Sequence, residues 1–158
     1  MRGLIGSDLL AHRNDYCTVD NPLDENSDPI VLLPAINPDF ALFHAPMADR
    51  YGNVWIGKAR ELMTMAHAAK HTLVTVEEIV DIDLMQDELH APATIPAHYI
   101  TSHCVAENGA WPLPLPGRYP ADAEELSRYV SLAKTEQGFE DYLQSQSNRP
   151  MQAAAASM

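Results

Sequence analysis

Between residues 40 and 76 an apolar strand, a helix and a second apolar strand follow one another, and this order constrains the fold more than any other feature. Apolar side chains recur at helical spacing in the helix predicted at 59–70. β-Branched residues fill the second strand, predicted at 72–76, and the first is predicted at 40–44. Such a unit builds a parallel sheet through a right-handed crossover. We therefore expect an α/β fold with an open, mainly parallel sheet.

The remaining pattern predicts short strands at 30–33, 54–56 and 99–106. Asp122 is expected to cap a C-terminal helix, with Glu125 three residues on, and Gly138 is expected to interrupt that helix. Turn-forming residues dominate the start of the chain. We predict an irregular lead-in at 1–28, one α/β domain at 29–146 and a flexible tail at 147–158.

The charge balance and the length of the apolar runs argue against two broad classes of function. Ten Lys and Arg against 22 Asp and Glu give a formal net charge of −12, and such a field repels phosphate backbones, which argues against nucleic acid as a partner. Since apolar runs stay well short of the ~18 residues that a bilayer needs, a membrane role is not expected. Two cysteines, Cys17 and Cys104, fit a reducing compartment, so we predict a cytoplasmic protein.

Metal and nucleophile motifs are weak. His67 and His71 are four apart on the predicted helix, a spacing that suits two ligands of one ion, but Ala68 stands where a metalloprotease motif needs Glu. We predict no metal site. The sequence has no Gly-x-Ser-x-Gly turn and no phosphate-binding glycine loop.

The polar residue types gather at the predicted carboxyl edge of the sheet, where open α/β folds bind ligands. The loop at 45–53 and the segment at 77–81 should share that edge. Two readings stay open there: Asp49 and Arg50 anchor a substrate carboxylate, or they form a local ion pair that fixes the loop. The predicted substrate-binding set is His44, Asp49, Arg50, Gly52, Asn53, Glu77 and Glu78.

Several segments in register resemble one family. The run from His44 to Asn53, the helix at 59–70 and the segment at 72–80 resemble the A (alpha) subunit of family I CoA-transferases, in the glutaconate CoA-transferase-like branch. Residues 34–39 and 109–112 fit the same subunit in order. The resemblance implies a NagB/RpiA-like fold, an open sheet with helices on both faces, here without its N-terminal part.

The resemblance also implies a reaction and a partner. Such subunits pair with a B-type subunit, and CoA passes between carboxylic acids through a glutamate that forms a glutamyl-CoA thioester. That glutamate is expected in the partner, so this chain is expected to hold no catalytic residue and no activity alone, with Glu78 as a weak candidate. CoA, acyl-CoA and a small carboxylic acid are expected as substrates, with no bound cofactor. In oxoacid CoA-transferases a Glu-Asn-Gly tripeptide marks the nucleophile, and the tripeptide from Glu107 to Gly109 resembles it. We interpret this match as coincidence, because the tripeptide directly precedes a segment typical of the A-type chain.

Two alternatives remain beside the A-type transferase subunit. One is an acyl-CoA hydrolase on the same scaffold. The other is a non-catalytic α/β module that survives by self-association, for which an apolar sheet edge should be exposed.

Overall fold

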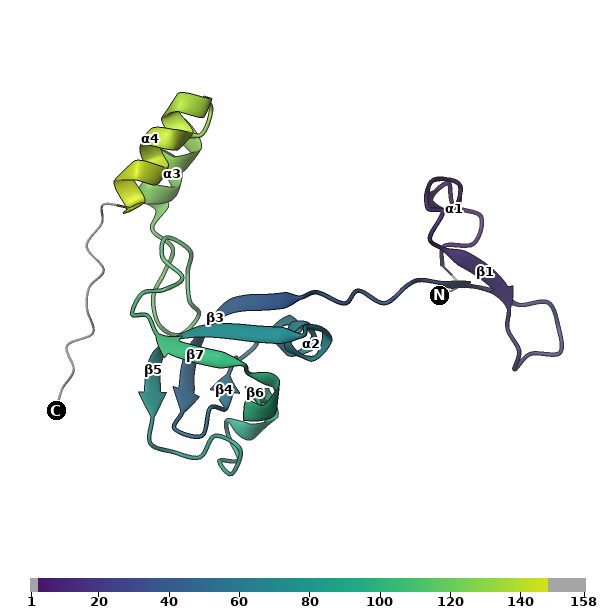
Figure 1. Ribbon diagram of the computed structural model, residues 1–158, viewed down its shortest axis with the longest axis horizontal. Coiled ribbons are helices and arrows are strands. Elements are labelled where there is room, and N and C mark those ends of the chain that lie inside the picture. Colours follow the sequence, from purple (N-terminus) through teal and green to yellow (C-terminus); the bar gives the residue numbers. More distant parts are fainter. Residues whose placement is uncertain (1–2, 148–158) are drawn as a thin grey trace. The chain divides into compact units, whose positions relative to one another are not determined.

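The computed structural model describes residues 3–147 (Figure 1). The chain divides into two compact units, one ending at Asn37 and the other beginning at Pro38. This division falls nine residues later than the predicted start of the α/β domain at residue 29. Each unit is described by itself.

The first unit holds a short hairpin that the sequence did not predict. After the single helical turn α1 (Leu9–His12), strand β1 (Cys17–Asp20) pairs in antiparallel fashion with β2 (Pro29–Leu32). The connection closes where Asn21 Nδ2 donates to Asp28 Oδ2 at 3.0 Å. Residues up to 28 are therefore not wholly irregular. Periodicity missed β1 because it has four residues, three of them exposed.

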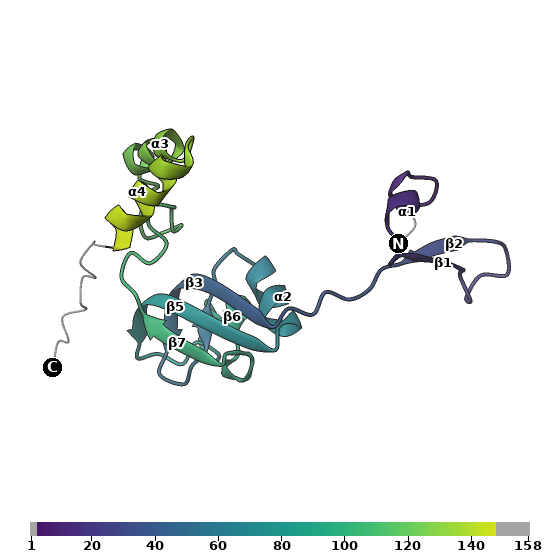
Figure 2. The ribbon, with the colours of Figure 1, turned by 45° about the horizontal axis from the view of Figure 1, so that its top comes forward.

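The second unit is built on a five-stranded sheet in the order β6-β4-β3-β5-β7. Its strands are β3 (Phe40–Asp49), β4 (Val54–Trp55), β5 (His71–Val80), β6 (Thr94–Ile95) and β7 (Ser102–Val105). Figure 2 shows β3, β5 and β7 side by side. The predicted parallel pairing of the two long strands is confirmed, with β5 parallel to β3 and to β7.

The sheet is mixed, because two short antiparallel pairs adjoin the parallel strands that the sequence predicted. β4 pairs in antiparallel fashion with both β3 and β6. A tight turn returns the chain from β3 directly into β4, and Gly52 supplies the positive φ of +89° that this turn requires. β3 and β5 also extend past their predicted ends, because Pro46 and the two glutamates after Val76 continue the strands.

Helix α2 (Glu61–Ala68) connects the parallel strands and buries Ala66 in the core. The core gathers the inward side chains of the sheet: Phe43, Ala45, Ala48, Val54, Ile56, Val74, Val76 and Ile95. The helix is shorter than the predicted 59–70, and His71 begins β5. The paired-histidine spacing considered for a metal therefore does not exist on one helix. Two single 3₁₀ turns, Ala91–Ala93 and Ala97–Tyr99, flank β6.

The side chains of β3 alternate between a buried and an exposed face near its start. Ala41, Phe43 and Ala45 are buried, whereas Phe40 is 63% and Leu42 70% exposed. The described residues therefore leave this part of the second face uncovered, where the family resemblance implied helices on both faces.

The described chain ends in a helical hairpin, α3 (Ala123–Leu132) and α4 (Glu136–Ser147). The predicted cap is confirmed, since Asp122 Oδ1 accepts from the Glu125 amide at 3.0 Å. The break falls at 133–135 instead of at Gly138, which lies inside α4. A Cβ on Gly138 would stand 2.3 Å from the Leu132 carbonyl oxygen, so glycine permits the close approach of the two helices. Most of the predicted tail lies outside the described residues.

Across residues 3–147 we find no helix that is both long enough and apolar enough to cross a bilayer.

Candidate functional site

A cluster of long-range hydrogen bonds forms around Glu77, which lies within β5 rather than after it as predicted. Its Oε1 accepts from His44 Nε2 at 2.7 Å and from the Tyr119 hydroxyl at 2.7 Å. Backbone amides supply the rest: Asn108 N donates to Oε2 at 2.8 Å and Gly109 N to Oε1 at 3.3 Å. This group of residues is called the Glu77 cluster.

His44 links the cluster to the sheet. Its Nδ1 lies 2.8 Å from Thr75 Oγ1, and the His44 side chain is only 10% exposed. The carboxylate of Glu77 can only accept, so Nε2 carries a proton, whereas the Thr75 hydroxyl can either donate or accept. Both ring nitrogens are therefore occupied. His44 holds Glu77 in place and is not a free base.

The segment after β7 completes the cluster, in contrast to the prediction. The sequence pattern gave the tripeptide from Glu107 to Gly109 no role, yet its last two amides hold the Glu77 carboxylate. Asn108 has a positive φ of 55°, which aims successive N–H groups at one acceptor. A Cβ on Gly109 would stand 2.6 Å from the His44 ring. The turn-forming Asn-Gly pair was the available signal.

Hydrogen bonding sets the charge state of the cluster. Burial raises the pKa of Glu77, but hydrogen bonds from Tyr119, the Asn108 amide and His44 outweigh it and bring the pKa below its ordinary value. Burial and the bond to Glu77 raise the pKa of Tyr119 to about 12. The hydroxyl of Tyr119 also accepts from the Ala110 amide at 3.0 Å. Near neutral pH the cluster is thus an ionised carboxylate surrounded by donors.

Asp49 organises the turn at residues 49–53, called here the Asp49 turn. It is fully buried, and its Oδ1 accepts from the amides of Tyr51 and Asn53, both at 2.9 Å. Its Oδ2 accepts from Asn53 Nδ2 at 2.8 Å and from Leu84 N at 3.0 Å. Burial opposes the ionised form, yet these hydrogen bonds prevail and lower the pKa of Asp49. Asn53 Oδ1 in turn accepts from the Ala97 amide.

Two of the predicted residues form ion pairs at the surface. Arg50 Nη1 donates to Asp81 Oδ1 at 2.9 Å, with 59% and 89% of the side chains exposed. Glu78 pairs with Arg118, and its side chain is 48% exposed. The ion pair of Arg50 is therefore not the local one considered with Asp49, because Asp81 lies 31 positions along the chain.

The seven predicted residues thus fall into three places. His44 and Glu77 meet in the Glu77 cluster; Asp49, Gly52 and Asn53 build the turn; Arg50 and Glu78 lie on the surface. Their assignment to substrate remains a prediction. In the part of the chain that is described, no group of three or more His, Cys, Asp or Glu side chains is placed to hold a metal ion.

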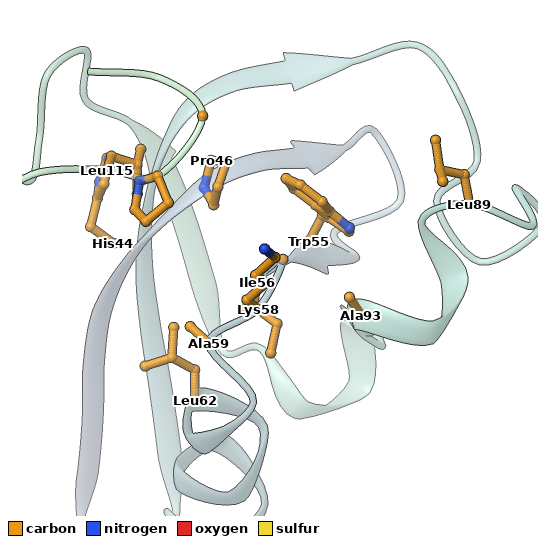
Figure 3. Close-up of a pocket in the computed structure, with 13 residues that line it drawn as sticks. His44, Pro46, Trp55, Ile56, Lys58, Ala59, Leu62, Leu89, Ala93 and Leu115 are labelled. Atoms are coloured by element: carbon orange, nitrogen blue, oxygen red, sulfur yellow. The ribbon is translucent and has the colours of Figure 1, made fainter. Parts of the chain in front are cut away.

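A cavity of about 510 Å³ lies beside the Glu77 cluster (Figure 3). His44 and Pro46 of β3 form one wall, and Leu115 to Gly117 of the segment after β7 form another. The remaining lining comes from Trp55, Ile56, Gly57, Lys58, Ala59, Leu62, Leu89 and Ala93. Tyr119 and Arg118, which follow the second wall, are tied to Glu77 and Glu78. The cluster therefore positions one wall of an apolar cavity.

Comparison with known proteins identifies the class. The family model described as coenzyme A transferase matches residues 19–101, more than half of the chain. The protein therefore belongs to the coenzyme A transferase family.

Three relatives extend the match. The chain is 32% identical over 127 residues to the A-type subunit of glutaconate CoA-transferase from Acidaminococcus fermentans, which covers 78% of this chain and 38% of that protein. It is 30% identical over 146 residues to the A-type subunit of 3-oxoadipate CoA-transferase from Pseudomonas knackmussii, covering 88% of this chain and 48% of that one. The crystal structure of a variant of the decarboxylase AibA/AibB superposes with a TM-score of 0.75 at 33% identity, over 89% of this chain and 50% of that chain.

The A. fermentans enzyme also matches in structure, with a TM-score of 0.68 at 27% identity over 84% of this chain. The match covers 41% of that chain. The protein described here thus spans half or less of the length of these relatives.

Proposed function

We propose that this chain is an A-type subunit of a CoA-transferase, or a fragment of one. It pairs with a B-type subunit and shapes part of an acyl-CoA site. The observation that carries the proposal is the match to two A-type CoA-transferase subunits over 78% and 88% of this chain. The relatives are A-type subunits by name, and a partner subunit follows from that name. The net charge of −12 supports a small-molecule role over a nucleic-acid one.

In the proposed reaction a glutamate carboxylate of the partner attacks the thioester carbonyl of the donor acyl-CoA. This releases CoA thiolate and forms an acyl–glutamyl anhydride. The thiolate then attacks the glutamyl carbonyl, which releases the first acid and leaves a glutamyl-CoA thioester. The second acid repeats the two steps in reverse, so a new acyl-CoA leaves and the glutamate is regenerated.

The hydrogen bonding of Glu77 and Glu78 supports the proposal that the nucleophilic glutamate belongs to the partner subunit. Both oxygens of Glu77 accept from donors, four in all, which lowers the nucleophilicity of the carboxylate. Glu78, the weak candidate, is engaged by Arg118. The chain's own contribution is to shape and position: the Glu77 cluster holds the wall of the apolar cavity. We place the protein in the cytoplasm, where acyl-CoA substrates and two free, exposed cysteines are compatible.

The test is reconstitution with a B-type subunit. The full chain is mixed with the B-type subunit of glutaconate CoA-transferase, and the complex is followed by native mass spectrometry and by exchange of CoA from acetyl-CoA to glutaconate. We expect a mixed complex that exchanges CoA, and loss of exchange when the glutamate nucleophile of the partner is replaced by alanine. A homo-oligomer that ignores the B-type subunit would favour the self-associating module instead.

A second function is favoured by one observation. A decarboxylase superposes on this chain with a TM-score of 0.75, above the 0.68 of the CoA-transferase structure. The same scaffold therefore serves CO₂ release in a relative. Release of ¹⁴CO₂ from carboxyl-labelled glutaconyl-CoA, without formation of a second acyl-CoA, would select this function over transfer. Appearance of the free acid and CoA alone would select the hydrolase.

A further inference from the structure

The cavity beside the Glu77 cluster offers hydrogen-bond donors to a ligand but no carboxylate. Most of its lining is apolar, from Pro46, Ile56, Leu62 and their neighbours (Figure 3). Its polar side chains are those of His44, Trp55 and Lys58. Both ring nitrogens of His44 already have partners. The groups left to a ligand are therefore two donors, an ammonium and an indole N–H, and no carboxylate of the described residues lines the cavity.

Lys58 is set apart from most other cations of the protein. Arg13, Arg50, Lys70, Arg118 and Arg128 each form an ion pair with an acidic side chain. Among residues 3–147, only Arg60, Lys58 and Lys134 do not, and Arg60 donates to the Pro92 carbonyl. Lys58 is the Lys or Arg side chain that lines this cavity, and it has no acidic partner among the described residues, in a chain with 22 acidic residues. Lys134 lines a separate hollow beside Leu126 and Val130.

Trp55 carries the second donor. Its Nε1 is buried and has no hydrogen-bond partner among the described residues, which is costly for an N–H group removed from water. Figure 3 shows the indole nitrogen at the end of the ring that faces Leu89, another residue of the lining. Because this nitrogen has essentially no exposed surface, a ligand oxygen reaches it only when a neighbouring side chain shifts. Leu89, whose side chain is 80% exposed, is one lining residue with room to do so. An acceptor oxygen brought by a ligand would satisfy this N–H.

We propose that this cavity binds an aliphatic carboxylic acid, or the acyl end of its thioester, with the hydrocarbon body on the apolar wall and the oxygens toward Lys58 and Trp55. The inference rests on the proposed function, because it names the class of acid and its site. The volume of about 510 Å³ suits a short acid rather than a whole acyl-CoA. An apolar body accounts for most of the affinity, and the exposed ammonium adds selectivity for the carboxylate.

The experiment uses sodium hexanoate as the probe and the ¹⁵N-labelled full chain. Titration is followed through the indole N–H peak of Trp55, which is assigned by comparison with a Trp111→Phe variant. We expect hexanoate to shift that peak with saturation. Affinity should rise roughly three- to fourfold per methylene from butanoate to hexanoate. 1-Hexanol, which has the same tail without the charge, should bind roughly three- to fivefold more weakly.

Matched variants separate the effect of the Lys58 ammonium on hexanoate binding from the effect of a change in net charge. Lys58→Met should weaken hexanoate binding by roughly three- to fivefold and leave 1-hexanol unchanged. Lys134→Met removes the same charge from the other described lysine without an acidic partner, outside this cavity, and should change neither ligand. Ala93→Leu narrows the cavity and should weaken the binding of both ligands. Equal effects of the two lysine variants, equal affinity for hexanoate and 1-hexanol, or no saturable shift would each overturn the proposal.

This outcome is separable from that of the proposed function. Binding of hexanoate to the chain alone, with no CoA exchange on reconstitution, would keep the acid site and reject the transferase. CoA exchange that is unaffected by Lys58→Met and Ala93→Leu would keep the transferase and reject this site.

Discussion

Asp49 and Glu77 are both carboxylates that collect backbone N–H groups, yet they organise the chain over different distances. Two of the residues that donate to Asp49, Tyr51 and Asn53, lie within four positions of it. All the donors to Glu77 are 31 to 42 positions away. The Asp49 turn is therefore largely a local device, whereas the Glu77 cluster joins β3, β5 and the segment after β7.

The comparison also distinguishes a carboxylate that stabilises the fold from one that lies beside a cavity. Asp49 is 0% exposed, so no ligand reaches it. The Glu77 side chain keeps 12% exposure, and its partner His44 lines the cavity. A dense run of polar residues in the sequence thus marked a turn that stabilises the fold. The arrangement next to the cavity depended on residues far apart in the chain.

The largest effect is expected for Asp49→Asn. The amide places an NH₂ donor where two N–H groups already point, so buried donors lose their acceptor. We expect the free energy of unfolding to fall by about 3 kcal/mol or more in urea denaturation. A loss below about 1 kcal/mol would contradict the structural role of the Asp49 turn.

Glu77→Gln should have a smaller and more local effect. Loss of the charged acceptor should cost about 2 kcal/mol and speed amide exchange in residues 107–119, while the core strands keep their protection. Glu78→Gln, next along β5, is the matched control and should change neither property beyond experimental error. Equal effects of Glu77→Gln and Glu78→Gln would contradict the claim that Glu77 stabilises the segment after β7 and Glu78 does not.

The same variant gives a pH test. The pKa of Glu77 lies below its ordinary value of 4.5 in the folded protein. Its stabilising contribution is therefore complete above the unfolded pKa and is lost as pH falls through the lower, folded value. The difference in unfolding free energy between wild type and Glu77→Gln should shrink as pH falls below about 4.5. A constant difference down to about pH 2 would show that the charge of Glu77 does not contribute.

Gly109→Ala should disturb the cluster through shape alone. The new methyl group would stand 2.6 Å from the His44 ring, so either the ring or the segment after β7 must move. We expect displaced His44 ring resonances in NMR spectra and about 1–3 kcal/mol of destabilisation. Gly3→Ala, where a Cβ would meet nothing within 4 Å, is the control.

The smallest effect is expected for Arg50→Ala. Arg50 and Asp81 are both mostly exposed, and such pairs contribute little to stability. The thermal midpoint should stay within experimental error. If the variant nevertheless weakens assembly with the B-type partner, Arg50 faces that partner, as predicted from its loop.

Sequence reasoning recovered the parts of the fold that local patterns encode. The parallel crossover from β3 to β5 followed from apolar periodicity, and the Asp122 cap followed from its spacing to Glu125. The antiparallel strand β4 has two residues, and its direction depends on a turn centred on Gly52. Periodicity contains no such information, so the antiparallel pairing of β4 was not predicted.

The candidate site was recovered in part, for the same reason. His44 and Glu77 were both predicted and do meet, at 2.7 Å. Asn108, Gly109 and Tyr119 reach Glu77 only through the tertiary path of the segment after β7. Pairing over more than 30 positions leaves no periodic trace in one sequence. Lys58 was missed because one lysine beside a helix is indistinguishable from an ordinary surface residue.

The most direct test of the Glu77 cluster is hydrogen exchange at two amides, those of Asn108 and Gly109. Because both donate to Glu77, we predict that they exchange slowly in the wild type and roughly tenfold or more faster in Glu77→Gln. Equal rates in the two proteins, or wild-type rates matching those of an unstructured peptide, would contradict the claim that Glu77 holds this segment as a wall of the cavity.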